Sequence, residues 1–310
     1  MPRFLLLLNR ASGGNERGMD ADEVCREVEA AFRAQGHEIE SRKVDPRLLD
    51  AAIQQAISED PDGIIAAGGD GTVSAAARQL GGTEVALGVL PMGTFNLAAR
   101  DLGVPLDIPE AADFLAKAQT LPIDVLNVNG HACLCTTILG FYPEFARTFE
   151  KRDHGGRWWK KAWKLATRLP ATFSQSRSVN LSWDQPDGCH SVRTKFSAFV
   201  PGRYRATAGL VPARTDFNSG TMTAYIGRQK IAGEAIRGML DYVIGRQDLN
   251  PDLTIFRTSQ LLLHGAGKKH STVMIDGEVI RLRFPLKLEI QPNHLKVLTT
   301  PDSLIDPDSE

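Results

Sequence analysis

The sequence predicts an α/β protein with a parallel sheet in its first part and an antiparallel, β-rich, sandwich-like second part. In the first part, short apolar runs alternate with helical patterns, and alternating strands and helices typically form a parallel sheet. In the second part, apolar residues recur with a period of two, which is typical of strands with one buried face. We expect domains of residues 1–122 and 123–295, with residues 296–310 packing back on the first domain.

Composition limits the classes of protein that the chain fits. With 310 residues, of which 42% are hydrophobic, it is long enough to bury two cores. Its net charge of -1 gives no general attraction for nucleic acid, so we expect no nucleic-acid partner. The apolar run at residues 4–8 is too short for a signal peptide or a membrane span, so any membrane contact is expected to be peripheral. We expect a cytoplasmic protein with reduced thiols, because no metal-site spacing or CxxC pair joins its cysteines, which are Cys25, Cys133, Cys135 and Cys189.

Local patterns predict the individual strands and helices of the N-terminal domain. Short apolar runs predict strands at residues 4–8, 37–44, 63–67 and 85–90. Apolar residues three or four positions apart predict helices near residues 24–32, 48–57, 73–80, 94–100 and 109–118. Strands and helices therefore alternate along the whole of this domain.

The second part is expected to consist mostly of hairpins. Its first two strands are predicted at residues 123–128 and 132–139, and Asn129-Gly130 between them favours a type I′ turn. Strict alternation of apolar and polar residues predicts further strands at residues 179–183 and 192–200. This part of the chain is therefore expected to be antiparallel.

A glycine turn stands between the strand at residues 63–67 and the following helix, and consists of Gly68, Gly69, Asp70, Gly71 and Thr72. Glycines let backbone N–H groups approach phosphate oxygens, Thr72 is placed to cap the helix, and a helix N-terminus favours an anion. Asp70 would repel phosphate unless it binds a cation, a ribose hydroxyl or neighbouring N–H groups. The alternative is a tight turn with an aspartate cap. Ser74 excludes a dinucleotide fingerprint, and the chain has no GxxxxGK[ST] loop.

A second glycine turn follows the next strand and contains Gly93, Thr94 and Asn96. Turns on adjacent parallel strands place two helix N-termini at one edge of the sheet, where open sheets bind ligands. Thr94 and Asn96 are therefore candidates for contacts with phosphate or hydroxyl groups. The alternative is a capped helix on which such side chains are merely solvated. A polar loop with Asn9 and Ser12 follows the first strand and is expected at the same edge.

At this point the sequence resembles the diacylglycerol kinase catalytic-domain family, which includes bacterial lipid kinases and sphingosine kinases and is more distantly related to NAD kinases. The matching motifs are Asn9-x-x-Ser12-Gly13, Gly68-Gly69-Asp70-Gly71-Thr72, Pro91-x-Gly93-Thr94-x-Asn96-x-x-Ala99-Arg100 and Ile275-Asp276-Gly277-Glu278. The resemblance spans nearly the whole chain. It implies a nucleotide-binding α/β domain, a β-rich lipid-binding domain and an active site in the cleft between them.

The resemblance also implies roles for individual residues. Asp276 would be the general base, although its sequence pattern alone indicates only a hairpin turn. Asp70 would bind Mg2+. Asn9 and Ser12 would border the ATP molecule, whose phosphates would be held by Gly68, Gly69, Asp70, Gly71, Thr72, Gly93, Thr94 and Asn96.

Three positions depart from the usual family pattern. Ser74-Ala75 replaces a common Asn-Glu, which removes one acidic contact near the nucleotide. The turn at residues 216–220 has fewer carboxylates than the metal-binding turn of bacterial relatives, so we expect no strong metal site there. Arg10 stands in place of a common proline and adds a cation near the phosphate site.

Residues 157–169 carry a basic and an apolar stripe at helical spacing. The two stripes are Arg157, Lys161, Lys164 and Arg168, and Trp158, Ala162, Leu165 and Leu169. This composition favours contact with an anionic membrane surface, on the inner face of the membrane. The alternative is an amphipathic helix whose apolar stripe packs on its own domain.

The leading hypothesis for function is a lipid kinase that uses ATP and Mg2+ to phosphorylate a hydroxyl of a diacylglycerol-like or other lipid acceptor. A second hypothesis is a kinase of a soluble hydroxyl acceptor, such as NAD or a polyol, on the same scaffold. A third is a catalytically weak regulator that binds nucleotide or lipid. The residues that argue against the third hypothesis are Asp70, Gly93, Thr94 and Asp276, while Ala75 and Asn218 leave it some room.

Overall fold

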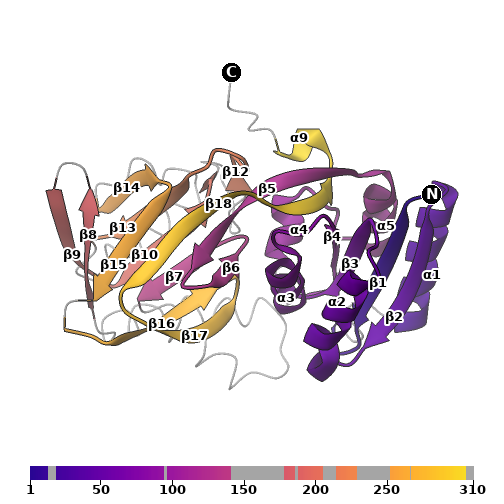
Figure 1. Cartoon of the computed structure of the whole chain (residues 1–310), viewed down its shortest axis with the longest axis horizontal. Coiled ribbons are helices and arrows are strands. Elements are labelled where there is room, and N and C mark those ends of the chain that lie inside the picture. The colour runs from indigo at the N-terminus through magenta and orange to yellow at the C-terminus, as the bar shows by residue number, and fades with distance from the viewer. Residues whose placement is uncertain are drawn as a thin grey trace.

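The structure is a computed structural model, and it describes residues 1–12, 19–93, 96–140, 178–185, 188–204, 214–228, 252–265 and 267–304. Figure 1 shows a first part in which helices surround a sheet and a second part built from strands. Thr94 and residues 157–169 lie outside the described residues, so the predictions made for them stay predictions. No helix in the described part of the chain is both long enough and apolar enough to cross a bilayer.

Four parallel strands form one end of a large sheet, in the order β2-β1-β3-β4. These strands are β1 (Arg3–Asn9), β2 (Glu38–Val44), β3 (Gly63–Gly68) and β4 (Ala86–Pro91). Every residue of β3 and β4 is buried, as expected for parallel strands with helices on both faces. Ala66 of β3 is in register with Leu7 of β1 and with Val89 of β4, so the carboxyl ends of these strands lie side by side.

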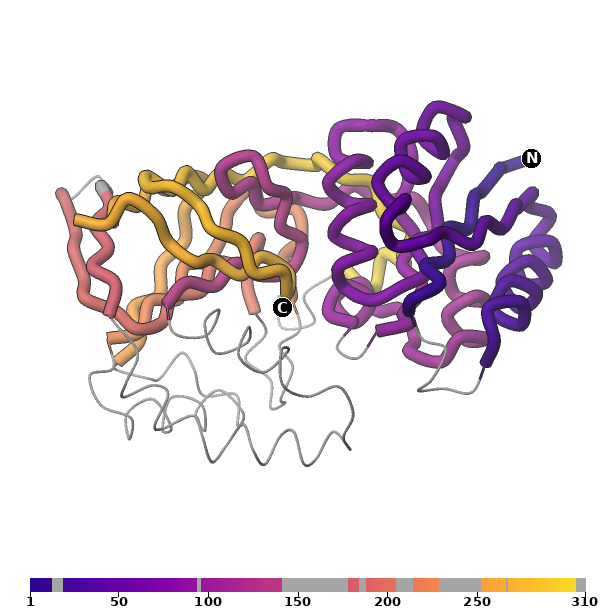
Figure 2. Tube along the Cα trace, turned by 90° about the horizontal axis from the view of Figure 1, so that it is seen from below, coloured from indigo at the N-terminus to yellow at the C-terminus, as the bar shows by residue number. Residues whose placement is uncertain are grey.

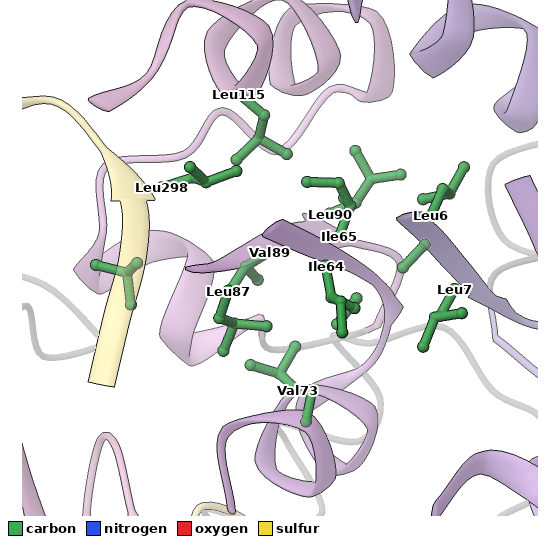
Figure 3. Close-up of a cluster of buried hydrophobic side chains, with 14 of the residues drawn as sticks. Leu6, Leu7, Ile64, Ile65, Val73, Leu87, Val89, Leu90, Leu115 and Leu298 are labelled. Carbon is green, nitrogen blue, oxygen red and sulfur yellow. The ribbon is translucent and has the colours of Figure 1, made fainter. Parts of the chain in front are cut away.

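Helices cover both faces of these strands. They are α1 (Ala21–Ala34), the short 3-10 helix η1 (Pro46–Leu48), α2 (Leu49–Ser58), α3 (Asp70–Leu80), α4 (Leu97–Asp101) and α5 (Ile108–Lys117). Figure 3 shows Leu115 of α5 on one side of the strands and Val73 of α3 on the other. The apolar face predicted for α1 is buried, and the helix begins where the Asp20 carboxylate accepts a hydrogen bond from the Glu23 N–H.

The second part is built from antiparallel strands. One sheet has the order β14-β13-β10-β7-β16-β17. Its members are β7 (Thr137–Gly140), β10 (Phe196–Pro201), β13 (Met222–Gly227), β14 (Leu253–Thr258), β16 (His270–Ile275) and β17 (Glu278–Arg283). The facing strands are β5 (Gln119–Val128), β6 (His131–Cys133), β8 (Val179–Gln185), β9 (Gly188–Thr194), β15 (Gln260–Gly265) and β18 (Leu286–Thr299). Phe199 of β10 and Leu263 of β15 are fully buried in one cluster between them, which confirms the predicted fold class.

Strands β5 and β18 connect the two parts. They pair with each other along most of their length, and β18 also pairs with β15 of the second part and, through Val297, with Leu87 of β4. Figure 2 shows β18 running from the second part into the first. Leu298 of β18 belongs to the core of the first part, whereas Leu288 belongs to that of the second. A division near residue 122 remains a proposal, and it falls inside β5.

Two long strands predicted from the sequence are each divided in the structure. The strand expected at residues 132–139 is β6 and β7, which belong to different sheets. The strand expected at residues 192–200 is likewise β9 and β10. Both predictions of a single strand are wrong for the same reason: alternation of apolar residues reports which face is buried and carries no information on which sheet supplies the partner strand.

The last described residues lie against the first part. The Thr299 hydroxyl donates a hydrogen bond to the carbonyl of Leu102 at 2.7 Å, just after α4. The short helix α9 (Pro301–Leu304) follows, and Leu304 packs against the first core. The final strand therefore contributes to the stability of the first part.

We predict that Leu298→Ala destabilises the protein by about 2–5 kcal/mol, because its side chain is 2% exposed and its removal leaves a cavity. Leu262→Ala is the matched control, since Leu262 is 44% exposed and its truncation should cost less than about 1 kcal/mol. Denaturant unfolding measures both. Equal losses in the two variants would contradict the placement of β18 in the first core.

Candidate active site

The two glycine turns lie at the carboxyl ends of β3 and β4 and contact each other. A Cβ atom on Gly93 would stand 2.6 Å from the Cα of Gly69, so a side chain there would collide with the neighbouring turn. A Cβ atom on Gly68 would collide with the side chain of Thr72. Gly71 differs, because no atom of the described residues lies within 4 Å of a Cβ atom at that position. The turns are therefore closely packed at their base and open at Gly71.

Helix α3 begins directly at the first glycine turn. Gly69 is the N-cap residue, and because it has no side chain it makes no capping hydrogen bond. The prediction that Thr72 caps the helix is wrong, because the helix already starts at Asp70 and Thr72 is buried inside its first turn. An uncapped helix N-terminus is free to bind an anion.

Asp70 joins the two turns through backbone N–H groups. Its Oδ1 accepts a hydrogen bond from the Leu97 N–H at 2.7 Å, and its Oδ2 accepts one from the Asn96 N–H at 3.1 Å. Burial raises the pKa of Asp70 above its usual value, while these hydrogen bonds and the bond to its own N–H oppose the rise. The sequence left a cation, a ribose hydroxyl or neighbouring N–H groups as partners of this carboxylate, and the structure shows it bound by N–H groups. Each oxygen keeps the capacity to accept a further bond.

The Asn96 side chain closes the second glycine turn. Its Oδ1 accepts from the Gly93 N–H at 2.8 Å, and its Nδ2 donates to the Gly93 carbonyl at 2.9 Å. The residue has a left-handed backbone, with φ of 51°, a conformation that asparagine tolerates better than most residues. Both polar atoms of the Asn96 side chain are therefore used within the turn. The predicted contact with phosphate would have to come from other groups of this turn.

Asn9 and Ser12 lie at the carboxyl end of β1, at the same edge. The Asn9 Nδ2 donates to the Thr72 hydroxyl at 2.9 Å, and its Oδ1 accepts from the Ala11 N–H at 3.0 Å. The Ser12 N–H donates to the Asn9 carbonyl at 3.0 Å. Asn9 thus ties the polar loop to the first turn of α3, and the structure brings the three predicted polar segments together.

Asp276 occupies the turn between β16 and β17. Asp276 and Gly277 both have positive φ angles, 46° and 91°, as a type I′ turn requires. The side chain is buried, and its carboxylate accepts from the N–H groups of Leu134, Cys135 and Thr136 at 2.6, 2.8 and 2.9 Å. The turn indicated by the hairpin pattern is present, and it also holds a buried carboxylate.

The two carboxylate oxygens of Asp276 have different surroundings. Oδ1 accepts from two N–H groups and lies 3.4 Å from the Cys133 thiol, so its acceptor capacity is used. Oδ2 accepts from Leu134 and, weakly at 3.4 Å, from the Ser74 hydroxyl. Oδ2 therefore has room for one more donor, on the side of Ser74 and α3.

Burial raises the pKa of Asp276, and its hydrogen bonds to Leu134, Thr136 and Cys135 oppose the rise. Asp70 lies close enough for the two carboxylates to repel each other, which raises the pKa of Asp70 as well. A carboxylate with a raised pKa is a better proton acceptor at neutral pH than an exposed one.

Sequence patterns do not point to the groups that bind Asp276. Residues 134–136 bind it through backbone N–H groups. Such bonds cannot be predicted from the side chains of these residues. Ser74 stands out in the sequence only as a departure from the family pattern, yet its hydroxyl links α3 to Asp276. Beyond Ser74 is a small hollow, lined among others by Arg78, His131 and Glu278.

The turn at residues 216–220 is held together by the protein itself. The Asp216 carboxylate pairs with Arg257, and the Gly220 N–H donates to the Asp124 Oδ2 at 2.6 Å. Asn218 donates to the carbonyl of Pro122 at 2.9 Å. Within the described ranges, no group of three or more His, Cys, Asp or Glu side chains is arranged to hold a metal ion.

Comparison with known proteins identifies the relatives of this fold and site. Residues 3–128 match the family model of the diacylglycerol kinase catalytic domain. A Cronobacter sakazakii protein named "Probable lipid kinase YegS-like" is 38% identical over 130 residues, which cover 40% of this chain and 41% of that protein. An uncharacterized protein of Synechocystis is 37% identical over 260 residues, which cover 81% of this chain and 58% of that protein. The matched stretches therefore span about two to three fifths of these relatives.

Solved structures extend the likeness to the whole fold. A crystal structure described as a diacylglycerol kinase from Bacillus anthracis has a TM-score of 0.70 at 18% identity, over 97% of this chain and 98% of that chain. A putative diacylglycerol kinase from the same organism has a TM-score of 0.72 at 17% identity, with the same coverage. The two-part fold is thus that of these two solved structures. The resemblance to the diacylglycerol kinase catalytic-domain family is confirmed, with the family model itself covering residues 3–128.

We predict that Gly71→Val leaves the unfolding temperature within a few degrees of the parent, because its side chain would enter open space. The same side chain would block close approach of a phosphate to the turn, so ATP affinity should fall at least about tenfold. Gly93→Ala is the opposite case, because its Cβ atom would meet the Gly69 backbone and lower stability. Calorimetry with ATP and thermal unfolding test both, and unchanged ATP affinity in a folded Gly71→Val protein would show that the turn is only structural.

Proposed function

We propose that this chain is a lipid kinase that transfers the γ-phosphate of ATP, with Mg2+, to a hydroxyl of a diacylglycerol-like or other lipid acceptor. One observation carries the proposal: the Ser74 hydroxyl, one turn into the helix that follows the glycine turn, lies 3.4 Å from Oδ2 of Asp276. The helix that follows the first glycine turn and the buried carboxylate are therefore in contact. Phosphoryl transfer needs this combination of positioned phosphate and proton acceptor.

The glycine turns suit the phosphates of ATP. Among the described residues nothing crowds Gly71, and the N-cap residue Gly69 makes no side-chain cap bond, so the N-terminus of α3 suits an anion. Asp70 suits Mg2+, because each of its oxygens accepts an N–H bond from the second turn and keeps acceptor capacity. Mg2+ is commonly bound by one or two carboxylates together with substrate phosphates, whose charge it neutralises.

Asp276 is proposed as the general base. The acceptor hydroxyl would approach Oδ2 from the side of Ser74 and replace the weak Ser74 contact. Oδ2 would then take the hydroxyl proton as the oxygen attacks the phosphorus atom. The three N–H groups that bind the carboxylate keep it in place and oppose its protonation before the acceptor arrives.

A soluble hydroxyl acceptor remains the second candidate, because the hollow beside Ser74 is lined by Arg78, His131 and Glu278. Such polar side chains suit a polyol or a polar headgroup. A catalytically weak regulator is disfavoured by the position of Asp276. Peripheral contact with an anionic membrane through residues 157–169 stays a prediction, as those residues lie outside the described part of the chain.

We predict that a panel of acceptors with radiolabelled ATP and Mg2+ yields a labelled lipid product. The panel would contain diacylglycerol and phosphatidylglycerol in mixed micelles, with NAD and glycerol as soluble acceptors. Chelation of Mg2+ should abolish labelling in each positive case. Labelling of a soluble acceptor alone would favour the second candidate, and no labelling with any acceptor would contradict kinase activity on these substrates.

We predict that Asp276→Asn slows transfer by roughly 10² to 10⁴-fold while ATP binding persists, because it removes the proton acceptor. Asparagine also cannot accept all three N–H bonds, so the unfolding temperature must be measured and the assay run well below it.

Ser74→Ala is the matched variant, since it removes only the weak hydroxyl contact with Oδ2 and leaves the N–H bonds intact. Its rate should stay within about tenfold of the parent, the effect of one lost hydrogen bond. Full activity in Asp276→Asn, or an equally large loss in Ser74→Ala, would contradict the role of Asp276.

A further inference from the structure

Arg214, in β12 (Arg214–Thr215), is a buried cation with an unusual set of partners. Its Nη1 donates to the carbonyl of Leu134 and its Nη2 to that of Asp124, both at 2.9 Å. The guanidinium also lies over the ring of Phe217, 4.5 Å from the centroid. Burial lowers the pKa of Arg214, and the negative charges of Asp101 and Asp124 oppose this change. The Arg214 backbone N–H also donates to Asp101 Oδ1 at 3.0 Å.

One peptide group connects Arg214 to Asp276. The carbonyl of Leu134 accepts from Arg214, and the N–H of Cys135, at the other end of the same peptide group, donates to Asp276 Oδ1 at 2.8 Å. A peptide group carries a dipole with its negative end at oxygen and its positive end at N–H. The cation and the carboxylate therefore lie at the matching ends of this dipole, and each hydrogen bond polarises and strengthens the other.

We propose that Arg214 is a positioning residue, which acts through the peptide group between Leu134 and Cys135 to hold the Asp276 carboxylate in its ionised form and orientation. The inference rests on the proposed role of Asp276 as the base. It explains why a buried guanidinium is placed beside the segment between β6 and β7. It also gives Asp276 a distant partner of opposite charge.

The other groups around Asp276 do not supply this positive charge. Titratable groups on which Asp276 acts electrostatically include Asp70, Asp101, Cys133 and Cys135, none of which is a cation. Burial raises the pKa of both thiols well above their usual value, so they are neutral. Arg78, His131 and Glu278 line the hollow on the solvent side of Ser74. Arg214 is thus the cation on the buried side of the site.

A purely structural role is the alternative, because Arg214 also ties β12 to β5 and to residue 134. The two roles predict different results for charge removal. A structural role lowers stability and leaves the titration of Asp276 unchanged in the protein that remains folded. The proposed role makes Asp276 easier to protonate once the positive charge is gone.

The test compares Arg214→Gln and Arg214→Lys with the parent. The readout is the carboxyl 13C NMR titration of Asp276 in aspartate-labelled protein, assigned by its absence in Asp276→Asn. Arg214→Gln should raise the pKa of Asp276 by about one unit or more, the size of effect that a nearby charge produces. Arg214→Lys keeps the charge and should leave the pKa of Asp276 within about half a unit of its value in the parent. Arg257→Gln, which removes an exposed cation paired with Asp216, is the control and should leave it unchanged.

Transfer activity should follow the titration. A base works only when deprotonated, so the rate falls as the pH drops through its pKa. In Arg214→Gln, this acid limb of the kcat/KM profile should move to higher pH, and activity should recover at alkaline pH. The limb should stay in place in Arg257→Gln.

A folded Arg214→Gln protein in which Asp276 titrates as in the parent would overturn the proposal. If Arg214→Gln does not fold, Arg214→Lys decides, because a rise of one unit or more despite the retained charge would equally overturn it. The NMR titration needs no turnover. A parent protein that labels no acceptor would therefore contradict the proposed function, while the titration would still decide the role of Arg214.

Discussion

The pairing of β5 with β18 is the connection on which the rest of the structure depends. Through these strands, the parallel strands of the first part and one of the two antiparallel layers of the second part form one continuous hydrogen-bonded sheet. Leu298 of β18 fills the first core and Leu288 fills the second. The two parts are therefore fixed relative to each other by backbone hydrogen bonds and by apolar burial, and Ser74 meets Asp276 across 202 positions of sequence.

The candidate site is organised by backbone groups more than by side chains. Asp70 is held by the N–H groups of the second glycine turn, and Asp276 by those of residues 134–136. Each carboxylate is thus held in place by the backbone of a different part of the chain. Because Asp276 is buried, Asp70 is partly buried and the two carboxylates repel each other, negative charge is concentrated at one place, which suits a site that binds a cation with its substrate.

Local patterns in the sequence are enough to predict the parallel half of the fold. Residue spacing predicts β3, the glycine turn and α3 because helix and strand periods are set by neighbouring residues alone. The break between β6 and β7 escapes such patterns, since the choice of partner sheet depends on distant residues. The same limit applies to the site: glycine turns are visible in the sequence, but the N–H groups of residues 134–136 are not. The role of Asp276 comes from family resemblance, because its own pattern indicates only a turn.

The bulge in β18 has a mechanical consequence. The register between β18 and β5 shifts between Gln291 and Leu295, where Asn293 has φ of 51° and donates its N–H to Asp124 at 2.9 Å. Ladder pairing resists sliding of one strand past the other, and a bulge is where such a ribbon bends and twists most readily. The bulge at Asn293 therefore sets a local bend and twist in the double strand that joins the two parts.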